Sequence, residues 1–137
     1  AEAEEVLQTG YGFELMAQTK NLFFDFTANT LDLAMVKIID AVGPERVMFG
    51  SDMPITKMRM YRICEDGHYV NVVPRGFYGD VSYDPNMKEV DDYSEMTTFM
   101  YEELRSFKKC AEELKLTREE VADVMCGNCR RLFGIEF

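Results

Sequence analysis

The sequence of 137 residues contains 15 Lys and Arg residues and 25 Asp and Glu residues, which gives a formal net charge of -10. Phosphate groups would repel such a chain, so nucleic acids and anionic membranes are disfavoured as partners. The 47% of hydrophobic residues indicates a soluble globular domain, no apolar run is long enough for a membrane span, and the acidic start is unlike a signal peptide, so we expect a cytoplasmic location.

Cysteine usage agrees with a reducing compartment. The four cysteines are Cys64, Cys110, Cys126 and Cys129, too few for the dense disulfide pattern of small secreted domains. Cys126 and Cys129 have the spacing of half a zinc or redox site, but a structural zinc site takes a second pair. Packing of a buried helix is therefore the favoured interpretation, with metal or redox chemistry as the alternative.

The first half of the chain predicts a strand, a helix and a second strand. Residues 21–29 are short, aromatic and mostly apolar, which favours a parallel strand covered on both faces. Residues 30–42 have helical apolar spacing and end at Gly43 and Pro44. Residues 46–49 form the second apolar run, so the order is that of a right-handed βαβ unit.

The second predicted strand ends abruptly in "GSDMP". Side chains at the carboxyl ends of parallel strands point into a shared crevice, so Asp52 is a candidate catalytic residue. Gly50 would allow a close backbone turn, Ser51 would fix the turn by hydrogen bonding, and Pro54 would stop the strand. The alternative is an Asx-type turn in which Asp52 only caps the strand.

Residues 55–93 predict a long loop or lid insertion, because prolines and glycines alternate there with aromatic residues. Its candidate ligands for a carboxylated substrate are Arg59, Arg62 and Arg75, since guanidinium groups pair with carboxylates. Tyr78 is a candidate wall of the pocket. The alternative for the arginines is an ordinary surface ion pair, and for Tyr78 it is core packing.

His68 is the single histidine of the chain. It follows Asp66 and Gly67, a pair typical of turns, so we expect a partly exposed loop or hairpin position. Contact with the substrate is the functional alternative for this side chain.

The last third of the chain predicts two helices. The first covers residues 95–114, and its apolar stripe consists of Met96, Phe99, Met100, Leu104, Phe107 and Ala111. Thr117 and Glu120 have the spacing of a capping box, which would begin a last helix that runs through Arg131.

Three segments together resemble a known family. They read "NLFFDFTAN", "VGPERVMFGSDMP" and "LTREEVADVMCGNCRRLFGI", and they are similar to the last part of the amidohydrolase-related metal-dependent hydrolases and decarboxylases. The resemblance covers residues 21–54 and 114–135. It implies that the G-S-D segment ends the eighth strand of a TIM barrel, and that Asp52 binds a divalent metal ion, most often zinc, with manganese or magnesium as alternatives, and handles a proton.

The chain also departs from that family pattern. It has no H-x-H pair, and only two barrel strands can be placed in it. The expected fold is therefore an α/β single-domain fragment, the C-terminal portion of a (β/α)8 TIM-type barrel, with the last two strands and their helix at 21–54, the insertion at 55–93 and helices at 94–137.

Two functions follow from this reading. The first is the C-terminal part of a metal-dependent hydrolase or decarboxylase for a small, carboxylated organic substrate, completed by the upstream chain and possible as a homo-oligomer. The second is a catalytically inert folding or interaction module that assembles with a partner chain.

Overall fold

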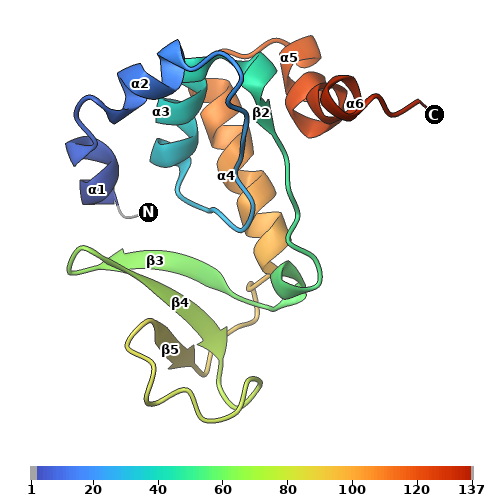
Figure 1. Cartoon of the computed structure of the whole chain (residues 1–137). Coiled ribbons are helices and arrows are strands. Elements are labelled where there is room, and N and C mark those ends of the chain that lie inside the picture. The colour runs from blue at the N-terminus through green and yellow to red at the C-terminus, as the bar shows by residue number, and fades with distance from the viewer. Residues whose placement is uncertain (1–2, 137) are drawn as a thin grey trace.

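The computed structural model describes residues 3–136, with helices gathered on one side and a three-stranded sheet on the other (Figure 1). Helix α4 runs between the two parts. The helices are α1 (Ala3–Gln8), α2 (Gly12–Gln18), α3 (Asp32–Val42), α4 (Phe99–Glu113), α5 (Arg118–Ala122) and α6 (Asn128–Phe133), and the strands are β1 (Phe24–Asp25), β2 (Val47–Met48), β3 (Tyr61–Glu65), β4 (His68–Pro74) and β5 (Met87–Val90). None of these helices combines the length and the apolar character that crossing a membrane requires.

Strands β1 and β2 are parallel and α3 connects them, so the predicted order of strand, helix and strand is confirmed. Phe24 pairs with Val47 and Asp25 pairs with Met48. Each strand is shorter than predicted, because the chain beyond it makes other hydrogen bonds: the Phe49 N–H donates to the Val124 carbonyl at 2.9 Å. The described residues therefore form a mixed α/β fold in which β1 and β2 make a two-stranded parallel sheet, and no larger part of a barrel.

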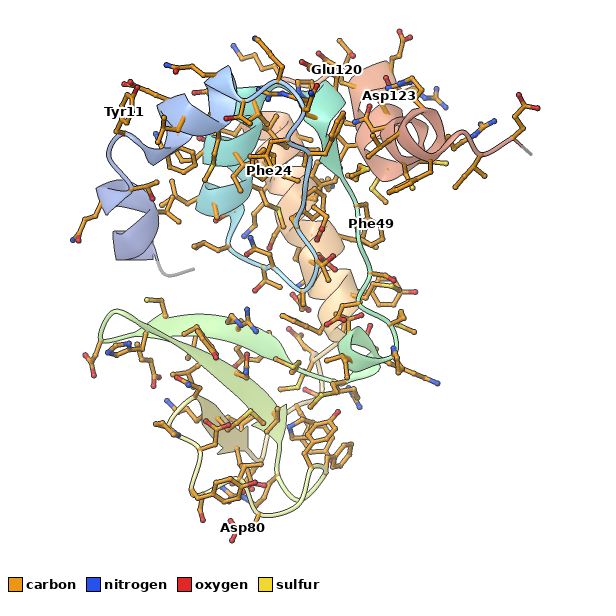
Figure 2. The ribbon with its side chains drawn as sticks, in the orientation of Figure 1. Tyr11, Phe24, Phe49, Asp80, Glu120 and Asp123 are labelled. Carbon is orange, nitrogen blue, oxygen red and sulfur yellow. The ribbon has the colours of Figure 1, made fainter. Side chains whose placement is uncertain are left out.

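The main core lies where α3 and α4 pack against this βαβ unit. Its buried residues are Phe26, Met35, Val36, Ile39, Val42, Val47, Phe107, Cys110 and Val124. The ring of Phe26 stacks on Phe107 with centroids 5.1 Å apart and meets the edge of Phe49 at 6.0 Å. Phe49 stands near the carboxyl end of β2 in Figure 2. Burial of each large apolar side chain contributes about 1.5–3 kcal/mol, which fixes the two strands relative to the helices.

Of the four cysteines, the pair that was expected to pack a buried helix is not buried: Cys126 is exposed, which corrects that expectation, and Cys129 is only partly buried. All four are free, and Cys110 is fully buried in the core. Burial raises the pKa of the Cys110 thiol to about 11, so this side chain is a packed, uncharged group.

The segment predicted as a long loop contains an ordered sheet. Strands β3 and β4 form an antiparallel hairpin, and β5 lies parallel to β4 on its other side. The hairpin turn is Asp66–Gly67, where both residues have positive φ, and His68 begins β4 as an exposed hairpin residue. A second core of Met60, Val73 and Phe99 joins this sheet to α4. A lid role for the sheet stays a prediction.

The last helices differ from prediction at one end. Helix α4 begins at Phe99 instead of Glu95, because an isolated bridge pairs Thr98 with Arg59. The capping box of Thr117 and Glu120 is confirmed at the start of α5. A short π-helix, Asp123–Gly127, joins α5 to α6.

Candidate functional site

The carboxyl ends of β1 and β2 lie side by side, since the strands are parallel and paired. Asp25 ends β1, and Asp52 follows β2 by four residues. Between them the backbone approaches closely: a Cβ atom added to Gly50 would lie 2.0 Å from Thr27 Oγ1 and 3.4 Å from Asp25 Oδ1. Glycine at position 50 is therefore needed for the contact of the two strand ends, as the sequence pattern suggested.

The turn that carries Asp52 is stabilised by hydrogen bonds that do not involve the Asp52 carboxylate. The Met53 N–H donates to Ser51 Oγ at 3.4 Å, the Thr56 N–H donates to the Asp52 carbonyl at 3.3 Å, and the Thr56 hydroxyl donates to the Ser51 carbonyl. Asp52 adopts a left-handed φ of 47° and is exposed. Within residues 3–136 its carboxylate makes no hydrogen bond, so the capping alternative finds no support.

The described residues do not make a complete metal site by themselves. No group of three His, Cys, Asp or Glu side chains between residues 3 and 136 is close enough to hold an ion. The neighbouring Asp25 carboxylate already accepts the Thr27 N–H at 3.0 Å. A free carboxylate such as that of Asp52 suits a divalent cation, but it supplies one ligand only.

Arg59 and Tyr78 lie in contact, and both form hydrogen bonds with other groups of this chain. The Arg59 guanidinium donates to the Met96 carbonyl at 2.6 Å and to the Tyr93 carbonyl at 3.2 Å. The Arg59 N–H donates to the Tyr78 hydroxyl at 2.7 Å. These contacts fix the segment before α4 on the sheet; binding of substrate by Arg59 or Tyr78 stays a prediction.

Arg75 and His68 are not brought together. His68 begins β4 and Arg75 follows its end, so about 20 Å of strand separates them. Arg75 forms exposed ion pairs with Asp91 at 2.6 Å and Glu89 at 3.3 Å. A hydrogen bond and the charge of Asp91, with the charge of Glu89, raise the pKa of Arg75. A shared role of Arg75 and His68 at one substrate group is therefore not supported by this arrangement.

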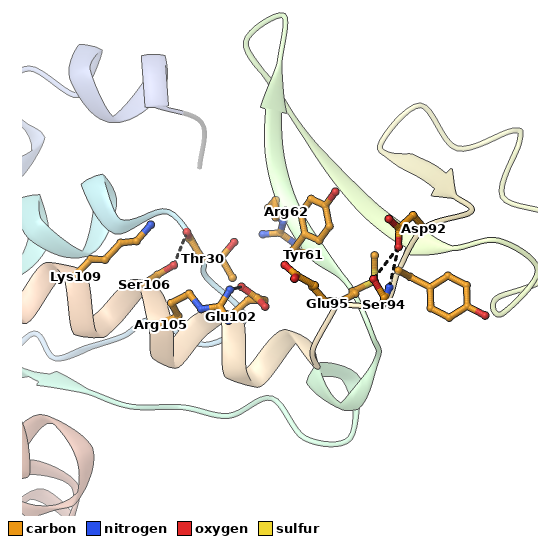
Figure 3. A pocket seen from close by; sticks show the side chains of 12 residues that line it. Thr30, Tyr61, Arg62, Asp92, Ser94, Glu95, Glu102, Arg105, Ser106 and Lys109 are labelled. Carbon is orange, nitrogen blue, oxygen red and sulfur yellow. Dashed lines mark hydrogen bonds and ion pairs between the residues drawn. The ribbon is translucent and has the colours of Figure 1, made fainter.

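A polar hollow of about 590 Å³ opens between β3, the segment before α4, and α4 itself (Figure 3). Its charged lining residues are Arg62, Asp92, Glu95, Glu102, Arg105 and Lys109. The two signs are balanced, and Arg105 is paired with Glu102 at 2.9 Å. Of the six residues that the sequence predicted for the site, Arg62 lines this hollow, whereas Asp52, Arg59, His68, Arg75 and Tyr78 do not.

The residue that the sequence reasoning missed is Glu103. It is fully buried on α4, where its Oε1 accepts the Asn29 N–H at 3.4 Å and its Oε2 has no partner within the described residues. Burial, with smaller contributions from the charges of Asp25 and Asp52, raises the pKa of Glu103 to about 7. The signal was present in the sequence, because Glu103 lies four residues from both Phe99 and Phe107 on the buried side of the helix.

Comparison with known proteins gives one family. A family model described as amidohydrolase matches residues 12–135. No curated protein and no solved structure matches the chain. The matched range includes both parallel strands, the G-S-D turn with Asp52, the inserted sheet and the C-terminal helices. With nearly the whole chain covered by that model, this chain belongs to the amidohydrolase family.

Proposed function

We propose that this chain supplies the last two strands and the closing helices of an amidohydrolase-type (β/α)8 barrel. The complete enzyme would hydrolyse or decarboxylate a small, carboxylated organic substrate. The observation that carries the proposal is the Asp52 carboxylate, which is exposed at the carboxyl end of β2 on a turn that does not use it. Family membership supports the reaction class.

The proposed cofactor is a divalent metal ion, with zinc favoured over manganese or magnesium. The part of this chain in the metal site would be the single carboxylate of Asp52, and the remaining ligands would come from outside the described residues. A carboxylate placed beside such an ion is also suited to exchange a proton with water or substrate.

Other residues of the chain would shape the site. The contact of Thr27 with Gly50 fixes the height of the Asp52 turn against β1. Arg59 and Tyr78 anchor the inserted sheet beside it. Substrate contacts by Arg59, Tyr78, Arg75 and His68 belong to this proposal, as does assembly with the rest of the barrel or into a homo-oligomer.

The test is the substitution Asp52→Asn in the natural polypeptide, with Asp80→Asn as the matched control on an exposed loop. We expect Asp52→Asn to lower bound metal, measured by elemental analysis, and turnover of carboxylated substrates by about 100-fold or more. The Asp80→Asn protein should keep both. An Asp52→Asn protein with normal metal content and normal turnover would refute the proposal.

One observation favours the second candidate, an inert module that assembles with a partner chain. The outer edge of β2 is already covered, because Asn128 Nδ2 donates to the Val47 carbonyl at 2.8 Å and the Phe49 N–H donates to Val124. Apolar side chains near β1 stay exposed, including Leu22 at 39% and Phe23 at 37%. Binding of an apolar dye and obligate self-association, without bound metal, would support this candidate.

A further inference from the structure

The loop that follows β1 is gripped by side chains from two other elements. Ala28 in this loop has a left-handed φ of 52°, a conformation that non-glycine residues keep only when their surroundings impose it. The Asn29 N–H donates to the Phe26 carbonyl at 3.0 Å and is shared with Glu103 Oε1 of α4 at 3.4 Å, and the Ala28 carbonyl accepts from Arg62 of β3 at 3.3 Å. The Thr30 carbonyl accepts from the Ser106 hydroxyl at 2.9 Å.

Arg62 is well suited to hold a fixed position. Its guanidinium lies 4.7 Å from the centroid of the Tyr69 ring and 4.9 Å from that of Phe99, and its Nε donates to Asn71 Oδ1 at 2.9 Å. A planar guanidinium between two aromatic rings loses little further freedom when it forms a hydrogen bond. Arg62 therefore links the inserted sheet to the Ala28 carbonyl through a side chain of fixed conformation.

Glu103 holds the same loop from the side of α4. The carboxyl group of Glu103 is fully buried, and burial of a carboxyl group lowers the stability of the folded protein unless hydrogen bonds replace its contacts with water. Its Oε2 is unpartnered among residues 3–136, and its Oε1 accepts from Asn29 in the loop after β1, so the carboxyl group lies beside that loop. A residue chosen for packing alone at this position would be apolar.

The held loop in turn touches the turn of Asp52. Thr27 begins the loop, and its hydroxyl lies where a side chain at position 50 would have to be. We propose that Arg62 and Glu103 are positioning residues: they fix the loop of residues 27–30, and through the contact of Thr27 with Gly50 they fix the backbone that carries Asp52. The importance of this for catalysis rests on the function proposed above.

The experiment compares Glu103→Met, Arg62→Met and Glu103→Gln in the natural polypeptide, with Lys88→Met as control. Lys88 lies on the same sheet and pairs with Glu65 at the surface. We expect the two methionine variants at 62 and 103 to speed amide hydrogen exchange of Asn29 several-fold, up to about tenfold, because the loop loses one side-chain anchor while the bond from the Asn29 N–H to the Phe26 carbonyl remains. Glu103→Gln keeps an acceptor oxygen and should restore slow exchange, and Lys88→Met should leave it unchanged.

The second readout is the set of backbone amide chemical shifts of residues 50–52. They should move in the Glu103→Met and Arg62→Met proteins and stay in place in the Lys88→Met protein. Exchange of Asn29 equal to that of the wild type in both methionine variants would overturn the proposal, as would faster exchange throughout the chain with no local excess. Neither readout uses metal or substrate, so a failed Asp52→Asn test would leave this result standing.

Discussion

Glu103 should make the stability of the protein fall as the pH rises through neutrality. Burial, helped by the charges of Asp25 and Asp52, raises its pKa from an ordinary 4.5 to about 7, while the N–H groups of Asn29 and Ala28 oppose the shift. Between these two values the folded protein holds a proton that the unfolded chain has released. The stabilisation is complete below the unfolded pKa and is lost as the pH rises through the folded pKa.

The size of the effect follows from the shift. A difference of about 2.5 pKa units, at about 1.4 kcal/mol for each unit, amounts to about 3.5 kcal/mol over the whole pH range. The Glu103→Gln protein carries an uncharged side chain of the same shape and lacks this proton linkage. Part of this difference is already lost at about pH 5, so the wild type should lose about 2.5 kcal/mol relative to Glu103→Gln between about pH 5 and about pH 8.

The assay is urea unfolding of both proteins at several pH values, followed by circular dichroism. Use of the difference between them removes the contributions of the other titrating groups, which both proteins share. The reasoning fails if the difference in free energy of unfolding is the same at about pH 5 and about pH 8. Such a result would mean that water reaches the Glu103 carboxyl group in the folded protein.

Two further predictions concern close contacts near the strands. Gly50→Ala should lower the free energy of unfolding by about 1–3 kcal/mol, because the added Cβ would clash with Thr27 Oγ1. Part of that loss should be recovered when Thr27→Ala is added. An unchanged urea midpoint for Gly50→Ala alone would contradict the contact. Asn128→Leu should cost about 2 kcal/mol or more in urea unfolding, because the carbonyls of Pro44 and Val47 lose their donor; a change below about 0.5 kcal/mol would show that these carbonyls are solvated.

Local sequence patterns were sufficient to predict the elements whose signals are local. The βαβ order follows from two short apolar runs around a helical spacing that ends at Gly43, and the structure has that order. The capping box at Thr117 depends on residues three apart, and the hairpin turn before His68 depends on a single Asp-Gly pair. Each of these signals lies within one or two turns of chain, so tertiary neighbours had little to add.

The parts that were missed depend on contacts between distant segments. Strand β5 pairs in parallel with β4, and the sequence of its four residues does not predict which strand it pairs with. Glu103 is buried because α4 faces the loop after β1, 74 residues earlier in the chain, at the phase of Phe99 and Phe107. The predicted apolar stripe ran through Leu104 and did not include position 103. Arg62 was a candidate substrate ligand, with a surface ion pair as the alternative, and in the structure its guanidinium donates to the Ala28 carbonyl.

The two edges of the β1–β2 sheet differ, and the difference bears on how a barrel would assemble. At the outer edge of β2, Asn128 donates to the Val47 carbonyl and Val124 accepts the Phe49 N–H, the two bonds that one residue of a neighbouring parallel strand would make. A strand that pairs with β2 at this height must displace bonds worth about 2 kcal/mol.

At the outer edge of β1, Phe24 and Asp25 make no further backbone hydrogen bond within residues 3–136. A strand added there displaces nothing, and the exposed side chains of Leu22 and Phe23 lie beside it. If the proposed barrel forms, its sheet would grow from β1, and the C-terminal helix would leave β2 when the last strand pairs there. An inert module would keep that helix in place, so the Asn128 side-chain amide, which donates to the Val47 carbonyl only while the helix stays there, separates the two candidate functions by its NMR signal and hydrogen exchange in the assembled protein.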